Sequence, residues 1–368
     1  MNGTDFFPEK VFVVKDCLGQ PMTERILKRL AHVPMDVISD EREAHEDLLI
    51  CRDPLSKGKK RLLLTEQKGE YVKPCPCTPR HIGCNYYIIN ADVQCPMDCS
   101  YCILQAYLAS PIVTVHVNIG EMERQIVTFL KDNPRPLRIG TGELGDSLAL
   151  DHITDRSLDM IACFKNKKMA LFELKTKTVN IDNLMKNDPP DNVVIAWSLN
   201  AEKIASSEEK GAPSVIERIK AAAHVSKKGY YVAFHFDPLI LFPGWKDGYH
   251  EVIAELMAQI DRRKIAWISL GALRFAPLLK PVIKQRFPES KIIYGELIKG
   301  RDGKFRYFKP VRLELFRHIV GIFRKEGGEG LPLYFCMETE EIWQEILQKK
   351  PRSKEDVEKY LSLPLGFG

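Results

Sequence analysis

The sequence has little of what marks a membrane, fibrous or disordered protein. No stretch approaches the ~18 uninterrupted apolar residues of a membrane-spanning helix. The start, MNGTDFFPEK, lacks the basic and apolar segments of a secretory signal. Internal repeats and low-complexity segments are also absent. The 368 residues, 45% of them hydrophobic and 28% charged, have the composition of a globular protein. We therefore expect a cytoplasmic protein without a membrane partner.

An excess of charge of one sign is also lacking. The chain has 54 Lys and Arg against 49 Asp and Glu, a net charge of +5. This excess is too small to establish a nucleic-acid partner, so only its distribution is informative. Between Lys299 and Arg312, six basic residues alternate with three aromatic ones. Such a segment suits contact with phosphates and bases, or a solvated hairpin with one buried face.

Cysteine, by contrast, is plentiful and concentrated: six of the ten cysteines lie between residues 75 and 102. In a reducing compartment, clustered cysteines are more often metal ligands or reactive thiols than disulfides. Cys95, Cys99 and Cys102 form a C-x3-C-x2-C motif. Three thiolates can each bind one iron of a [4Fe–4S] cube and leave the fourth iron open for a small molecule. Zinc is the alternative, but it prefers paired motifs that give four ligands.

A second group of cysteines lies just upstream. Cys75, Cys77 and Cys84, with His81, have the residue types of a metal site, but the prolines in the CPC segment stiffen the loop. Packed or reactive thiols are the other interpretation, and the sequence leaves the choice open.

The middle of the chain alternates short β-like runs with amphipathic helical patterns, which predicts βα units and a parallel sheet. Five strands are expected, at Leu137–Gly140, Met169–Thr176, Val193–Ser198, Tyr230–Phe236 and Ile265–Leu270. A full or partial barrel is favoured over a doubly wound sheet. In both architectures, functional residues lie at the carboxyl ends of the strands. Trp197 is expected in the core, and His152 and His235 are expected to be structural.

Changes in pattern predict three regions. Residues 1–72 form an N-terminal extension, residues 73–291 the barrel, and residues 292–368 a C-terminal hairpin and helical region. The hairpin is expected around the Asp-Gly turn at residues 302–303, because Asp-Gly between two β-like runs favours a tight turn.

These motifs resemble the radical S-adenosylmethionine (SAM) superfamily, and several segments are similar to the spore photoproduct lyase family. The segments run in the family's order: CPMDCSYCILQ (95–105), GDSLALDH (145–152), TKTVNIDNL (176–184), WSLN (197–200), GWKDGY (244–249) and LRFAPLLKPVIKQRFP (273–288). The resemblance implies an α/β fold with a partial (β/α)6 TIM-type barrel. It also implies a [4Fe–4S] cluster, SAM, and a flavodoxin or ferredoxin as electron donor.

The resemblance also implies roles for individual residues. Cys95, Cys99 and Cys102 match the cluster ligands, Tyr101 the aromatic residue beside the cluster and SAM, and Gly142, Glu143, Lys177 and Ser198 SAM-contacting positions. Tyr101 and Glu143 are the predicted catalytic residues. Arg274 and the hairpin are the expected contacts with DNA.

Two positions depart from the family pattern. Glu143 stands where the lesion-repairing enzymes have a hydrogen-donating cysteine, and Ile103 stands where they have a tyrosine. The favoured function is radical cleavage of a DNA photolesion. The alternatives are a radical SAM reaction on another substrate, or a non-catalytic iron–sulfur protein that binds nucleic acid.

Overall fold

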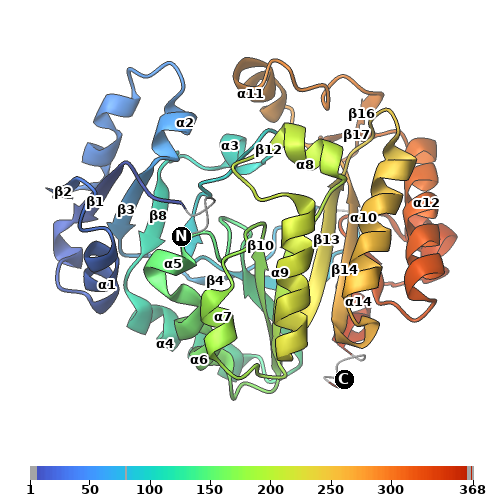
Figure 1. Cartoon of the computed structure of the whole chain (residues 1–368), viewed down its shortest axis with the longest axis horizontal. Coiled ribbons are helices and arrows are strands. Elements are labelled where there is room, and N and C mark those ends of the chain that lie inside the picture. The colour runs from blue at the N-terminus through green and yellow to red at the C-terminus, as the bar shows by residue number, and fades with distance from the viewer. Residues whose placement is uncertain (1–5, 79–80, 363–365, 367–368) are drawn as a thin grey trace.

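The structure is a computed structural model of the chain that describes residues 6–78, 81–362 and 366. Figure 1 shows a small sheet built from the N-terminal part of the chain on the left and a larger central sheet with helices along one face. Helix α12 lies on the right, on the side opposite the small sheet. Among the described residues, no helix is both long and apolar enough to cross a membrane.

The central feature is an eight-stranded sheet in the order β18-β14-β13-β11-β10-β9-β5-β4. Its strands are β4 (Val72–Pro74), β5 (Tyr86–Ile89), β9 (Leu137–Thr141), β10 (Ala170–Thr176), β11 (Val193–Ser198), β13 (Tyr231–Leu239), β14 (Ile265–Ala272) and β18 (Leu333–Phe335). All neighbours pair in parallel except β4 with β5.

The six strands from β5 to β14 follow one another in chain order without a reversal. A doubly wound sheet has such a reversal at its centre, so that alternative is wrong. The prediction of a partial α/β barrel is confirmed. The sheet also contains β18, a seventh parallel strand from the C-terminal region that the sequence analysis missed.

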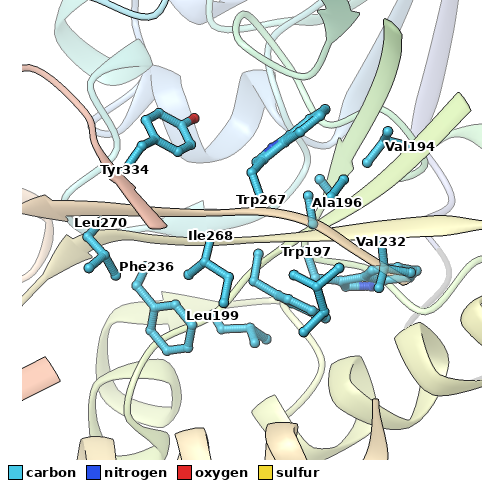
Figure 2. Close-up of a cluster of buried hydrophobic side chains, with 14 of the residues drawn as sticks. Val194, Ala196, Trp197, Leu199, Val232, Phe236, Trp267, Ile268, Leu270 and Tyr334 are labelled. Atoms are coloured by element: carbon cyan, nitrogen blue, oxygen red, sulfur yellow. The ribbon is translucent and has the colours of Figure 1, made fainter. Parts of the chain in front are cut away.

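Helices connect these strands and cover the outer face of the sheet (Figure 1). They are α4 (Ile119–Asp132), α5 (Asp151–Thr154), α6 (Arg156–Phe164), α7 (Asp182–Lys186), α8 (Glu202–Glu208), α9 (Val215–Lys228), α10 (Trp245–Gln259) and the 3-10 turn η3 (Arg262–Lys264). In Figure 2, Trp197, Leu199 and Phe236 point toward the helices, whereas Trp267 and Tyr334 stand on the opposite face. Trp197 is fully buried, which confirms its place in the core.

A second sheet of five strands lies at the N-terminal side, in the order β2-β1-β3-β8-β6. Its strands are β1 (Lys10–Val14), β2 (Met35–Ile38), β3 (Arg61–Thr65), β6 (Asp92–Val93) and β8 (Val113–His116). Its connections hold η1 (Lys15–Cys17), α1 (Pro21–Arg29), η2 (Glu41–Leu48) and α2 (Pro54–Gly58). Strands β6 and β8 come from beyond residue 72, so this sheet joins two predicted regions, and the domain boundaries stay a prediction.

The C-terminal region contains the predicted hairpin. Strands β16 (Leu297–Lys299) and β17 (Phe305–Tyr307) are antiparallel, with Gly303 in the turn at a φ of +77°. The other elements of this side of the molecule are β15 (Arg274–Phe275), which pairs with β17, then α11 (Leu279–Arg286), α12 (Lys309–Gly327), α13 (Glu340–Ile342), the π-helical turn η4 (Trp343–Leu347) and α14 (Lys354–Ser362).

Candidate active site

The three predicted cluster ligands lie on one loop between β6 and α3 (Leu104–Tyr107). Within this loop, β7 (Asp98–Cys99) pairs antiparallel with β12 (Glu209–Lys210), which follows α8. The side chains of Cys95, Cys99 and Cys102 pack in one small apolar cluster. The loop therefore gathers the three thiols beside the carboxyl ends of the barrel strands.

A buried cation lies next to these thiols. Lys59 is 3% exposed, and its ammonium donates to the backbone carbonyl of Met97 at 2.5 Å and pairs with Asp98 at 3.0 Å. Burial by itself lowers the pKa of Lys59, but the neighbouring Cys102 and Asp98 outweigh it and raise that pKa. A retained positive charge is the counter-charge that a group of thiolates requires.

The donor set fits an iron–sulfur cluster, since three thiols on one loop and a nearby cation match a cube held by three thiolates. In the described part of the chain, no three His, Cys, Asp or Glu side chains are arranged as a metal site. The assignment of the three cysteines as ligands therefore rests on residue type and spacing, and it stays a prediction.

The structure places three of the predicted SAM-site residues around one buried ion pair. The hydroxyl of Tyr101 donates to Glu209, and the ammonium of Lys177 lies 5.8 Å from the centre of the Tyr101 ring. Glu209 pairs with the fully buried Arg218 at 2.6 Å. Arg218 also donates to the backbone carbonyl of Ser198 at 3.1 Å. The pair thus connects the end of β11 with the cysteine loop.

Neither member of this pair was predicted from the sequence. Glu209 stands in the run Glu-Glu-Lys, which looks like the exposed end of a helix, and Arg218 stands among charged residues of α9. The one available signal is the position of Arg218 on the apolar stripe of α9, between Val215 and Ile219.

Gly142 and Glu143 follow β9. Gly142 has a φ of +91°, and a Cβ added there would lie 2.6 Å from the backbone carbonyl oxygen of Lys175, so glycine is required. The carboxylate of Glu143 forms an ion pair with the ammonium of Lys175 on β10. Burial alone would lower the pKa of Lys175, but Glu143 and Glu173 raise it. Glu143 therefore already holds a cationic amine, a partner that the sequence analysis did not foresee.

Asp146 fixes the loop after β9 against β10. Its carboxylate accepts from the hydroxyl of Thr176 and the backbone N–H of Lys177, both at 2.7 Å, and from the backbone N–H groups of Leu148 and Ala149 at 3.0 Å. These four hydrogen bonds hold the start of the Lys177 segment in place.

Charged residues also line the inner face of the barrel. Glu173 accepts from His235 at 2.7 Å and from the indole of Trp267 at 3.1 Å, and the Arg138 guanidinium lies 4.0 Å from the Trp267 ring centre. Burial raises the pKa of Glu173, but His235 and Arg138 outweigh it and lower that pKa to about 2. His235 thus forms a buried pair with Glu173, and His152 bonds to the carbonyl of Phe6. Both contacts agree with the structural roles expected of these histidines, which stay predictions.

The predicted DNA-contacting residues fall into two groups. Lys299 and Arg301 are exposed in the hairpin, as is Phe308, which directly follows it. Other basic residues of this segment are engaged within the protein: Arg306 with Asp302, Arg312 with Glu338, Lys304 with Thr78 and Lys309 with Glu341. Arg274 forms a bidentate pair with Asp237, both contacts at 2.9 Å. Part of the segment is therefore a buried hairpin face, and part is open.

A partial parallel barrel with a C-x3-C-x2-C loop and polar side chains at its carboxyl edge defines the class of radical SAM half-barrel enzymes. The family model "Spore photoproduct lyase" matches residues 78–314. The chain belongs to the spore photoproduct lyase family, and hence to the radical SAM lyases.

Curated relatives and solved structures agree with this family. The spore photoproduct lyase of Geobacillus sp. (strain Y412MC61) is 27% identical over 229 residues, covering 60% of this chain and 67% of the relative. That of Clostridium acetobutylicum is 22% identical over 220 residues, covering 59% and 65%. A structure of a spore photoproduct lyase cysteine-to-alanine mutant is similar with a TM-score of 0.79 at 22% identity, covering 90% of this chain and 100% of the other.

Another similar structure is a double mutant of spore photoproduct lyase with bound AdoMet and dinucleoside spore photoproduct. Its TM-score is 0.76 at 22% identity, and the match covers 90% of this chain and 99% of the other. At this level of identity, both structures support the fold.

Proposed function

We propose that this protein is a radical SAM lyase that starts the radical cleavage of a thymine photolesion in DNA. The match of the spore photoproduct lyase family model across the cysteine loop and the barrel carries the proposal. A solved relative bound to AdoMet and dinucleoside spore photoproduct supports both ligands.

In this proposal, Cys95, Cys99 and Cys102 would hold a [4Fe–4S] cluster, which would supply the electron for reductive cleavage of SAM. Lys59 provides a buried positive charge beside the thiolates. The ten free cysteines suit a reducing compartment such as the cytoplasm, and we propose a flavodoxin or ferredoxin as the electron donor.

In the same proposal, residues at the carboxyl ends of the barrel strands bind and orient SAM. Gly142 lets the chain after β9 turn close to the ligand, and Glu143 accepts from the SAM ammonium in competition with Lys175. Lys177 and Ser198 contact SAM from the ends of β10 and β11, and Tyr101 packs beside it. The ion pair of Glu209 and Arg218 holds Tyr101 and the end of β11 in their relative positions.

The substrate side follows from the exposed part of the hairpin segment. We propose that Lys299 and Arg301 contact DNA phosphates and that Phe308 packs against an exposed base. Removing both cations should reduce the slope of log affinity against log salt by about 2. Lys220→Ala with Lys227→Ala, exposed on α9, is the matched control and should leave the slope unchanged.

One observation favours a second candidate, a radical SAM reaction on another substrate. Glu143, paired with Lys175, stands at the position where the family resemblance places a hydrogen-donating cysteine. Ile103, which is 43% exposed, stands where the resemblance places the tyrosine of the radical relay. With this candidate, SAM is cleaved but the dinucleoside spore photoproduct is left intact.

The decisive experiment is anaerobic reconstitution followed by measurement of 5′-deoxyadenosine and of the thymidine units restored from dinucleoside spore photoproduct. About four irons per chain, 5′-deoxyadenosine and attack on the photoproduct are expected, with little clean repair because residues 143 and 103 lack the cysteine and tyrosine of the family. Cys99→Ala should abolish the iron-dependent absorbance, whereas Cys51→Ala, on a loop outside the site, should keep it. Iron loading of Cys99→Ala equal to the unmodified protein would contradict the ligand assignment. Iron loading without SAM cleavage would favour a binding protein.

A further inference from the structure

Two thiols outside the proposed reaction lie together in the loop after β4. The backbone N–H of Cys75 donates to the carbonyl of Tyr86 at 2.8 Å, and the N–H of Cys77 donates to the carbonyl of Cys75 at 2.7 Å. The second bond closes a three-residue turn around Pro76. This turn places the Cys75 and Cys77 side chains two residues apart on one tight loop, where each thiol influences the pKa of the other. The CPC segment is therefore a preformed dithiol.

The surroundings of the pair favour reaction at one sulfur. Cys77 is exposed, whereas Cys75 is partly buried. The neighbouring Cys75 thiol and the backbone N–H of Cys84 outweigh burial and lower the pKa of Cys77 to about 7. A Cβ added at Gly83 would lie 2.5 Å from the Cys77 sulfur, so this glycine allows the chain to pass close to it.

We propose that Cys75 and Cys77 form a redox-active dithiol that exchanges with low-molecular-weight disulfides and closes to an internal disulfide. The Cys77 thiolate attacks one sulfur of the small disulfide and releases one small thiol. Cys75, losing its proton, then attacks the Cys77 sulfur and releases the second small thiol. Two electrons and two protons pass from the pair to the small disulfide, and the step reverses with excess small thiol.

The pair lies close along the chain to residues that contact the C-terminal region. The ammonium of Lys304 in the hairpin donates to the hydroxyl of Thr78 at 2.8 Å, and the backbone N–H of Ile82 donates to the carbonyl of Glu338 at 3.0 Å. Residues next to the pair on the same loop therefore contact the hairpin and the segment after β18.

The test uses the full-length, cluster-loaded protein in anaerobic glutathione buffers of graded ratio. Free thiols are trapped with iodoacetamide, and the mass of the peptide that carries both cysteines is measured by mass spectrometry. We expect the fraction of this peptide that has lost two hydrogens to rise with the share of glutathione disulfide and to fall again when excess glutathione is added. The iron content should stay constant. At neutral pH, Cys77 should react about threefold faster than a thiol of ordinary pKa, since its larger thiolate fraction outweighs its lower nucleophilicity.

Variants separate the two sulfurs. Cys75→Ser should leave a lasting glutathione adduct on Cys77, Cys77→Ser should give neither adduct nor disulfide, and Cys51→Ser should behave as the unmodified protein. A lasting adduct on Cys77 in the unmodified protein would overturn the proposal, as would a disulfide from Cys77 to Cys84 or no reaction at all. Each of these three contradicting results would be observed in the unmodified protein, so the test does not depend on the folding of the variants. Loss of SAM cleavage in Cys99→Ala leaves the dithiol test unaffected.

Discussion

Replacement of Glu173 by Gln tests whether the charged interior of the barrel stabilises the fold. Glu173 is 2% exposed on β10, and its carboxylate accepts from His235 at 2.7 Å and from Trp267 at 3.1 Å. Gln keeps the shape of the side chain and removes its charge. The variant therefore isolates the charge of one buried carboxylate.

The magnitude follows from the pKa of Glu173, which lies at about 2 in the folded protein against an ordinary 4.5. A lowered pKa means that the folded state favours the charged form. The resulting stability is fully present above pH ~4.5 and is lost as the pH falls toward ~2. The shift corresponds to about 3 kcal/mol of unfolding free energy at neutral pH.

Urea unfolding followed by circular dichroism, from about pH 7 down to about pH 3, measures this contribution. Glu173→Gln should lose about 3 kcal/mol at neutral pH and become less sensitive to acid than the unmodified protein. Glu121 has the same lowered pKa of about 2 beside Arg124, but its side chain lies at the surface and is 35% exposed, so Glu121→Gln should change neither the stability nor its dependence on acid. Equal stability of Glu173→Gln and the unmodified protein across this range would refute the reasoning.

Three further predictions concern the site. Gly142→Ala should cost about 1–3 kcal/mol of unfolding free energy, because of its positive φ, and weaken SAM binding, whereas Gly321→Ala in open space on α12 should be neutral or stabilising by up to about 1 kcal/mol. Arg218→Met should lower the urea midpoint by the equivalent of about 3–5 kcal/mol, and adding Glu209→Gln should restore part of it; additive losses would contradict coupling in the pair. Glu143→Cys with Ile103→Tyr should raise clean repair of dinucleoside spore photoproduct, measured by chromatography of released thymine pairs. Cleavage of SAM without any attack on the lesion would favour another substrate.

The sequence predicted the strands that carry long β-like runs and the loop that carries the cysteines. It missed β5 and β18, of four and three residues, because runs this short do not stand out from loops. It also could not predict that β8 would pair with β3, since that contact joins segments about fifty residues apart along the chain.

The charged residues inside the barrel could not be predicted from the sequence for a different reason. Along β10, Glu173 and Lys175 alternate with the apolar Phe172 and Leu174, a pattern typical of a strand with one face in water. In a closed or curved sheet, the face opposite the helices is enclosed, so the same alternation places charges in the barrel. Hydrophobic periodicity marks which face carries charge, but only tertiary structure decides whether that face meets water or other charged groups.

The Glu143–Lys175 pair shows how this enclosure constrains the chemistry of the site. Lys175 has a side chain only 17% exposed, and Glu143 neutralises it across the ends of two adjacent strands. A cysteine at residue 143 would leave that ammonium buried without its partner, a costly arrangement. The glutamate and the lysine therefore form one unit, and Glu143→Cys alone disturbs the barrel edge as well as the chemistry. Combining Glu143→Cys with Lys175→Met separates these two effects, since Lys175→Met removes the unpaired buried charge and keeps most of the side-chain volume.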